Sequence, residues 1–421
     1  MAADLDLERL RNAAWLKTPA LQLIFAALAT TGAISRAVGG AVRNTLLGHA
    51  IDDIDIATTA TPDQIIAAAK HAKLQAVPTG LQHGTVTLIA DGTPFEVTTL
   101  RRDVATDGRH ATVAFTDDWA LDASRRDFTI NALYCDPDGT LFDPLGGRVD
   151  LMPTRVRFIG DARQRIREDY LRILRFFRFS ARYGGGAIDR DGVAACAAER
   201  AGFARVSAER IRVEMLKLLA TQHAPAICRT MQASGFLVSM LGTAPSPSRL
   251  ERLIAIEDYL GLPAEPVLRL AALALYPSCN VSDLARRLRL AGHERDMLAG
   301  IVSDWAALVA QHTLADDHRT IYRAGAAGFR DALLVAWAGH SVSVTDAAWR
   351  RRVAIADTWN RPKLPVTGQD VMALGIPAGV VVGRLLRAVE AWWLARDFVP
   401  DRRACLDELA LMVGAQSSFA G

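Results

Sequence analysis

The stretch that decides the fold of the N-terminal region reads Gly48-His49-Ala50-Ile51-Asp52-Asp53-Ile54-Asp55-Ile56-Ala57-Thr58. It alternates two carboxylates, Asp53 and Asp55, with isoleucines, as a strand with one acidic and one apolar face would. Two like charges held that close repel each other unless a cation lies between them. Mg²⁺ is the natural candidate, because it is usually held by one or two carboxylates and takes substrate phosphates as further ligands. The stretch therefore predicts a metal site on a strand edge.

A glycine pair lies about a dozen residues upstream, in the run Val38-Gly39-Gly40-Ala41-Val42-Arg43-Asn44. Residues without a Cβ let the backbone approach a triphosphate closely. A pair of metal ions can stabilise both the attacking and the leaving oxygen of an in-line displacement. Together the glycines and the carboxylates predict a nucleotidyltransferase. Glu96, in the next candidate hairpin, is either a third catalytic carboxylate or a solvent-facing glutamate.

The composition of the chain bounds the other possibilities. At 421 residues it should hold two or more domains, and only five of its 49 basic residues are lysine, so 44 are arginine. The arginine excess fits either a biased composition or the binding of phosphates and base edges by guanidinium forks. The five cysteines are scattered, which indicates neither a zinc site nor a disulfide framework. With no leader-like start and no long apolar run, we expect a cytoplasmic protein without a membrane span.

The hydrophobic pattern divides the chain into an α/β region and an all-α region. Residues 5–30 have helical periodicity, and Thr61-Pro62 looks like the start of a helix that runs towards Lys70. After Pro153 helical periodicity dominates to the end. The expected strands are 34–38, 53–57, 84–90, 94–100 and 128–135, and the expected helix breaks are 183–187, 243–247, 261–265 and 360–366. The predicted fold class is therefore α+β, with a small mixed sheet followed by helices.

Adjacent arginines open the block Asp122-Ala123-Ser124-Arg125-Arg126-Asp127-Phe128-Thr129-Ile130-Asn131-Ala132-Leu133. They could form plain surface ion pairs. Alternatively, one arginine on the active face of the sheet holds the triphosphate or ribose of a nucleotide, with Asp127 fixing its orientation.

A row of arginines follows in Arg167-Glu168-Asp169-Tyr170-Leu171-Arg172-Ile173-Leu174-Arg175-Phe176-Phe177-Arg178-Phe179. On one helix, Asp169, Arg172, Arg175 and Arg178 would form a single stripe. The stripe is either a solvated face or a site where an anion neutralises the arginines. A carboxylate and a guanidinium together also present acceptors and donors to a base edge, so the protein could recognise a nucleobase without a template strand.

These blocks resemble, in order, the motifs of the class II nucleotidyltransferases of the tRNA CCA-adding enzyme and bacterial poly(A) polymerase family. The family pattern is G-G-x-V-R-D, D-x-D, R-R-D-F-T-x-N-A and E-D-x-x-R, and the last three match outright. The first departs, because Asn44 stands where aspartate is usual. A weaker fifth block is Ser207-Ala208-Glu209-Arg210-Ile211-Arg212-Val213-Glu214.

The resemblance implies roles for individual residues. Asp53 and Asp55 would bind Mg²⁺, Asp169 and Arg172 would pair with the base edge of C or A, and residues 103–110 would form a flexible loop that tunes the switch between C and A. The nucleotide-binding set would be Gly39, Gly40, Arg43, Arg126, Asp169, Arg172, Arg175 and Arg178. The implied organisation is leading helices (1–30), a nucleotidyltransferase head or palm (31–152), a neck with the nucleobase-recognition helix (153–220), and an α-helical body and tail that bind tRNA (221–421).

Gly80-Leu81-Gln82-His83-Gly84-Thr85-Val86 is similar to a segment of the CCA-adding members. The favoured function is therefore template-independent addition of CCA to the tRNA 3′ end from CTP and ATP. The alternatives are a poly(A) polymerase, an enzyme that adds only CC or only A, and a non-enzymatic RNA-binding protein with an inactive palm. A P-loop NTPase is disfavoured, because the sequence contains no Gly-Lys pair. The sequence leaves the oligomeric state open.

Overall fold

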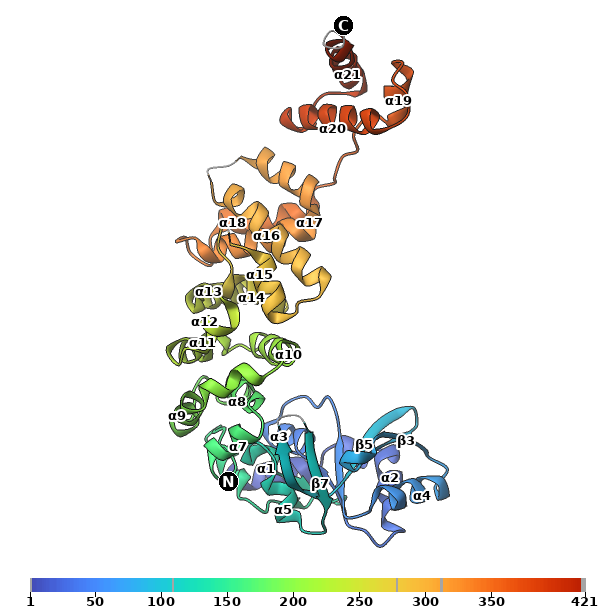
Figure 1. Cartoon of the computed structure of the whole chain (residues 1–421), viewed down its shortest axis with the longest axis vertical. Coiled ribbons are helices and arrows are strands. Elements are labelled where there is room, and N and C mark those ends of the chain that lie inside the picture. Colours follow the sequence, from blue (N-terminus) through green and yellow to red (C-terminus); the bar gives the residue numbers. More distant parts are fainter. Residues whose placement is uncertain (1, 108–109, 278, 311–312, 418–421) are drawn as a thin grey trace. The chain divides into compact units, whose positions relative to one another are not determined.

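The computed structural model describes residues 2–107, 110–277, 279–310 and 313–417 (Figure 1). The chain divides after Met240 into two compact units. Among the described residues, no helix is both long and apolar enough to cross a membrane. The predicted boundaries at residues 30, 152 and 220 stay predictions, and we keep head for 31–152 and neck for 153–220.

The first unit is built on a seven-stranded mixed sheet with the order β3-β4-β5-β2-β1-β8-β9. Only β2 and β5 run parallel, and the other neighbours are antiparallel. The strands are β1 (Ser35–Val38), β2 (Asp55–Thr58), β3 (Gln75–Gly80), β4 (Thr85–Ala90), β5 (Thr93–Thr99), β8 (Tyr134–Cys135) and β9 (Leu141–Phe142). The predicted α+β class with a small mixed sheet is confirmed.

Short helices accompany the sheet, and those within the first 30 residues and from Pro62 lie where the pattern predicted helices. They are α1 (Ala2–Arg11), α2 (Pro19–Ala29), α3 (Gly40–Leu47), α4 (Pro62–His71) and α5 (Trp119–Ser124), with 3₁₀ turns η1 (Trp15–Lys17), η2 (Leu81–His83) and η3 (Thr129–Asn131). Thr61 and Gln64 form a capping box at the start of α4. This cap is the physical reason that the predicted helix begins at Pro62.

The strand predicted over 128–135 is wrong for most of its length. Phe128 makes one isolated bridge with Phe158, residues 129–131 form η3, and only Tyr134–Cys135 pair in the sheet. The cause is local, because the Asp127 carboxylate accepts hydrogen bonds from the Phe128 N–H and from the Asn131 side chain. Such side-chain bonds offer the backbone an alternative to the ladder.

Three further differences concern a strand end, an edge strand and the predicted loop. β2 begins at Asp55 and not at Asp53, because Asp55 pairs with Val38 and β1 ends there, where the chain turns at Gly39. Edge strand β3 was missed; it carries Pro78 and a register irregularity, which weaken any alternating pattern. Residues 103–107 belong to β6 (Arg101–Asp107) and His110 begins β7 (His110–Phe115), so the predicted loop is largely a hairpin; residues 108–109 lie outside the described residues.

Every named element after β9 is a helix within the described part of the chain, which confirms the all-α prediction. The first unit continues with α6 (Gly147–Leu151), α7 (Ala162–Glu168), α8 (Leu171–Tyr183), α9 (Arg190–Ala198), η4 (Arg200–Arg205), α10 (Ala208–Leu219), α11 (Ala224–Ala233) and α12 (Phe236–Leu241). The second unit holds α13 (Pro247–Leu260), α14 (Pro266–Ala274), α15 (Val281–Leu288), α16 (Gly292–Val309), α17 (Leu314–Gly339), α18 (Ala347–Thr358), α19 (Gly368–Ala373), α20 (Val380–Ala395) and α21 (Arg402–Ser417). All four predicted breaks fall at junctions between helices.

An aromatic cluster holds α8 against the head. The ring centroid of Phe128 lies 5.1 Å from that of Phe158 and 5.3 Å from that of Phe179, and Phe158 stacks on Phe176 at 5.2 Å. Phe128 and Phe176 are fully buried. Figure 1 shows α8 next to the head. Because α8 carries the arginine row, this cluster sets where the row lies relative to the sheet.

We predict that Phe176→Ala lowers the free energy of unfolding of the first unit by about 3–5 kcal/mol, because it opens a cavity inside this cluster. Urea denaturation followed by circular dichroism measures the change. Val213→Ala, at a 45% exposed position of α10, is the control and should change it by less than about 0.5 kcal/mol. A loss below about 1 kcal/mol for Phe176→Ala would contradict the role of the cluster.

Candidate active site

One cavity of about 630 Å³ in the first unit gathers the predicted nucleotide-binding residues. Its walls come from the β1–α3 turn, the loop before β2, the 125–131 block, and the neck. The lining residues are Gly39, Gly40, Arg43, Asn44, Asp52, Asp53, Asp55, Arg125, Arg126, Asp127, Asn131, Asp169, Arg172, Arg175, Arg178, Phe179, Arg182 and Lys217. Glu96 is the one predicted site residue that does not line it.

The glycine turn forms the floor of the cavity beside the start of α3. Gly39 has φ +72°, a backbone conformation that favours glycine, and its N–H donates to the Leu133 carbonyl at 2.9 Å. A Cβ at Gly39 would lie 3.9 Å from Arg126 Nη1. The backbone at the N-terminus of α3 therefore lies beside an arginine, an arrangement that suits an anion.

The two aspartates lie at the start of β2. Asp53 is in the exposed loop, and Asp55 pairs with Val38 on one side and with Glu96 on the other. Burial raises the pKa of Asp55 above its usual value, and the neighbouring charges of Glu96 and Asp53 raise it further. Mutual repulsion of this kind is relieved by a bound cation.

The donor set fits an ion that is completed by its substrate. Among the described residues, no group of three or more His, Cys, Asp or Glu side chains is placed to hold a metal. Two carboxylates at a cavity wall nevertheless match the way Mg²⁺ is usually bound, with phosphate oxygens and water as its other ligands.

Arg43 projects into the cavity from α3 and is held by neutral groups. Its guanidinium donates to the side chains of Asn44, Asn131 and Tyr183, and its Cζ lies 4.2 Å from the centroid of the Tyr183 ring. Burial lowers the pKa of Arg43, although an arginine stays charged at any physiological pH.

Asp122 orients the two adjacent arginines, which corrects the role expected for Asp127. The Asp122 carboxylate is fully buried and accepts from Arg125 Nε at 2.8 Å, from Arg126 Nη2 at 3.1 Å and from the Tyr134 hydroxyl at 2.8 Å. Asp127 instead pairs with Arg175 at 2.6 Å. The position of Asp127 next to the two arginines had suggested that it binds one of them. The sequence signal for Asp122 was its i, i+4 spacing to Arg126, which brings the two side chains together on a helix.

Asp169 does not lie on the helix with the arginine row, as the stripe had suggested. It follows α7 with extended backbone angles, and one of its oxygens accepts from the Leu171 N–H at the start of α8. Arg210 of α10 binds its carboxylate through two hydrogen bonds of 2.6 and 3.1 Å. The sequence analysis named Arg210 only as a member of the weak fifth block.

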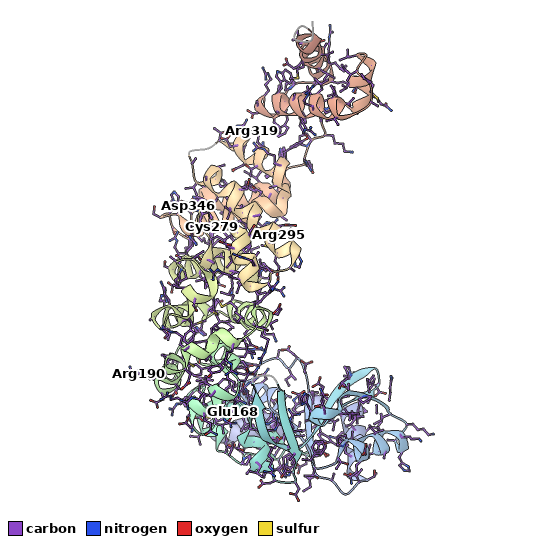
Figure 2. All side chains as sticks on the ribbon, viewed as in Figure 1. Glu168, Arg190, Cys279, Arg295, Arg319 and Asp346 are labelled. Atoms are coloured by element: carbon purple, nitrogen blue, oxygen red, sulfur yellow. The ribbon has the colours of Figure 1, made fainter. Side chains whose placement is uncertain are left out.

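Arg172 is held by partners other than Asp169. Its Nη1 binds Glu168 at 2.6 Å and the Arg165 carbonyl, and its Nη2 donates to the Arg125 carbonyl. Figure 2 labels Glu168, which lies where the neck helices meet the head. Asp169 and Arg172 therefore reach the cavity as two separately supported groups and not as a pair.

Carboxylates from other elements neutralise part of the arginine row. Besides the Arg175–Asp127 pair, Arg178 pairs with Glu214 at 2.5 Å and Arg175 approaches the same glutamate at 3.9 Å. Arg182 lies 3.7 Å from Asp52. The expectation that the row needs an external anion is thus only partly right, since Arg175 and Arg178 have carboxylate partners within the protein.

Comparison with known proteins places the chain among nucleotide-adding enzymes. A model of the poly A polymerase head domain matches residues 35–157, and one of a probable RNA- and SrmB-binding site of polymerase A matches residues 187–244. The chain is 36% identical over 368 residues to the mitochondrial CCA tRNA nucleotidyltransferase 1 of Homo sapiens, with 85% of this chain and 82% of the relative covered. It is 31% identical over 408 residues to the CCA-adding enzyme of Levilactobacillus brevis, with 92% and 95% covered.

Solved structures agree with this placement. The Bacillus stearothermophilus CCA-adding enzyme in complex with CTP is similar with a TM-score of 0.74 and 28% identity, covering 95% of this chain and 99% of that one. The Thermotoga maritima CCA-adding enzyme complexed with tRNA has a TM-score of 0.68 at 20% identity, covering 98% of each chain. The second likeness establishes a shared fold.

We predict that Asp122→Asn lowers the free energy of unfolding by about 3–5 kcal/mol at pH 7, because it leaves buried arginine charge without its partner. Burial alone would raise the pKa of Asp122, but Arg126 and Arg125 hold it below its usual value. A lowered carboxyl pKa stabilises the fold above the unfolded value of about 3.9, and this stabilisation is lost as the pH falls further, through the folded value.

The difference in the free energy of unfolding between the natural protein and the variant should therefore be largest at pH 7 and shrink below about pH 4. Denaturation at several pH values measures it. Asp118→Asn is the matched control, because Asp118 caps α5 at an exposed site where asparagine caps equally well. A difference that grows on acidification would contradict this assignment.

Proposed function

The chain belongs to the family of CCA-adding enzymes, and we propose that its cavity holds the nucleotide being added. It is a CCA tRNA nucleotidyltransferase, which adds C, C and A to the 3′ end of tRNA from CTP and ATP. One observation supports the proposed site above all others: a single cavity gathers residues of four motifs that are spread from Gly39 to Arg178 along the chain.

The family implies a divalent metal ion, and we propose Mg²⁺ at Asp53 and Asp55. When bound, such ions would lower the pKa of the attacking tRNA hydroxyl and neutralise the leaving pyrophosphate. Asp53 and Asp55 supply the oxygen ligands. Glu96, outside the cavity, adds negative charge beside Asp55 and so strengthens the attraction for a cation.

The chain's own groups would position the phosphates. The backbone at Gly39 and Gly40 and the guanidinium of Arg43 lie together on one wall. Arg126 uses Nε and Nη2 to bind Asp122 and Tyr134, which aims Nη1 at Gly39. In the described part of the chain Nη1 makes no hydrogen bond, so it is available to a phosphate oxygen. Positioning and charge stabilisation are the main contributions a protein makes to phosphoryl transfer.

Asp169 and Arg172 would read the base. Arg210 donates to both Asp169 oxygens and the Leu171 N–H donates to Oδ1, which leaves Oδ2 a lone pair to accept from an amino group of C or A. Arg175 and Arg178 complete this wall. We also propose a cytoplasmic location; the curated relatives include enzymes named as mitochondrial.

We predict that Asp53→Ala or Asp55→Ala reduces incorporation of labelled CTP into tRNA lacking its CCA end by at least about 10²-fold, because the cation loses a ligand. Folding should be unaffected, since each change removes a repelling charge. Asp63→Ala, at an exposed position in the first turn of α4, is the control and should retain activity. Undiminished incorporation by both site variants would refute the metal-binding role.

We predict that Asp169→Ala or Arg172→Ala lowers the preference between CTP and ATP by about tenfold, the value of one lost bidentate base contact. The affinity for the triphosphate should fall much less. Single-nucleotide incorporation assays with each nucleotide alone measure both quantities. Arg163→Ala, which removes a half-exposed arginine of α7, is the control. Equal losses with both nucleotides would count against base reading by these residues.

The same assays separate the alternative activities. A poly(A) polymerase given ATP and an unstructured RNA would make long tails, whereas a CCA-adding enzyme adds one A to a tRNA that ends in CC. Product length with CTP alone tests addition of CC.

A further inference from the structure

Arg43 is a buried cation without a carboxylate partner among the described residues. It is 6% exposed, and the hydrogen bonds it donates within the described part of the chain go to Asn44, Asn131 and Tyr183, which are all neutral. The other arginines of the cavity wall differ: Arg126 has Asp122, Arg175 has Asp127 and Arg178 has Glu214. A buried charge of this kind is costly unless an opposite charge arrives, so Arg43 favours an anionic ligand.

Asn44 contributes two sets of contacts to this arrangement, the first through its side-chain oxygen and the second through its side-chain nitrogen. Its Oδ1 accepts from Arg43 Nη2 at 3.0 Å, from Arg43 Nε at 3.2 Å and from the Tyr183 hydroxyl at 3.1 Å. Its Nδ2 donates to the Ala50 carbonyl at 2.8 Å. The orientation of the amide follows from its neighbours, because a guanidinium can only donate and a carbonyl can only accept.

The second contact ties α3 to the loop that carries the metal-binding candidates. Ala50 lies three residues before Asp53 and five before Asp55, in the segment between α3 and β2. Asn44 is 4% exposed, so the donor side of its bond to Ala50 is buried, whereas Ala50 itself lies in the exposed loop. The Asn44 side-chain amide therefore connects Arg43, which we propose to bind phosphate, with the loop that leads to Asp53 and Asp55.

We propose that Asn44 is a positioning residue that keeps the full charge of Arg43 available to the phosphates of the nucleotide and anchors the loop before β2. The inference rests on the proposed phosphate-binding role of Arg43. Aspartate, which is usual here in the related motif, would place a carboxylate against Arg43 and compete with a phosphate for it. It would also turn an acceptor towards the Ala50 carbonyl and lose that bond.

The test compares Asn44→Asp with Asn44→Ala in the full chain at fixed Mg²⁺ concentration. Both variants lose the Ala50 bond, and only Asn44→Asp adds a negative charge. Calorimetric titration with CTP, ATP and inorganic tripolyphosphate gives the affinities, and steady-state assays give KM and kcat. Asn12→Asp, the same change at an exposed site of the first unit, is the control for net charge.

Asn44→Asp should lower the affinity of the protein for CTP, ATP and tripolyphosphate by a common factor of about ten. This is the size expected when one charge-assisted contact is neutralised. KM should rise by that factor with kcat changed by less than about threefold, a split that general loss of structure would not produce. Asn44→Ala should bind tripolyphosphate more tightly than Asn44→Asp does.

Equal or tighter binding of tripolyphosphate by Asn44→Asp would overturn the inference, as would an effect confined to CTP or ATP. Arg43→Ala separates this from the proposed function. If Arg43→Ala binds tripolyphosphate as the natural protein does, the phosphate role of Arg43 itself fails. If Arg43→Ala weakens binding and Asn44→Asp does not, only the role of Asn44 fails.

Discussion

The buried carboxylate of Asp127 is the constraint on which the rest of the site depends. One oxygen accepts from the Phe128 N–H and the Asn131 side chain, and the other binds Arg175. The first oxygen closes the turn η3, so Asn131 is placed where its own oxygen holds Arg43. The second oxygen fixes the arginine row of α8 against the head. A single side chain thus supports both the wall that we propose for the phosphates and the wall that we propose for the base.

The charges around the cavity fall into two groups with different uses. Asp122, Asp127 and Glu214 are paired with arginines, and these pairs hold the walls in place before any ligand arrives. The carboxylates at the start of β2 and the guanidinium of Arg43 have no such partners within the described residues. The nucleotide and cation that we propose to bind here would bring the opposite charges to both, and their binding would relieve a strain that the fold alone leaves in place.

The sequence predicted the elements better than the contacts. Strands at β1, β2, β4 and β5 and the all-α second half follow from periodicity, because each pattern is local. The block 128–135 has the composition of a strand, yet the bonds of Asp127 convert its start into a turn. The motifs placed the charged residues near the cavity but did not give their pairings: Asp169 is held by Arg210, 41 residues away in the chain. Pairings of that range depend on tertiary packing, which no local pattern contains.

The preference for arginine over lysine has a structural use at this site, whatever its origin in composition. The Arg126 guanidinium binds Asp122 and Tyr134 with two of its nitrogens and still turns a third towards Gly39. A lysine has one nitrogen on a flexible stem, so a bond to Asp122 would draw the charge away from the cavity. Arg172 likewise engages Glu168 and two carbonyls at once. A planar guanidinium can bind groups of the protein with some of its nitrogens and a ligand with the others. The arginine side chains of this cavity are therefore held in place before any ligand binds.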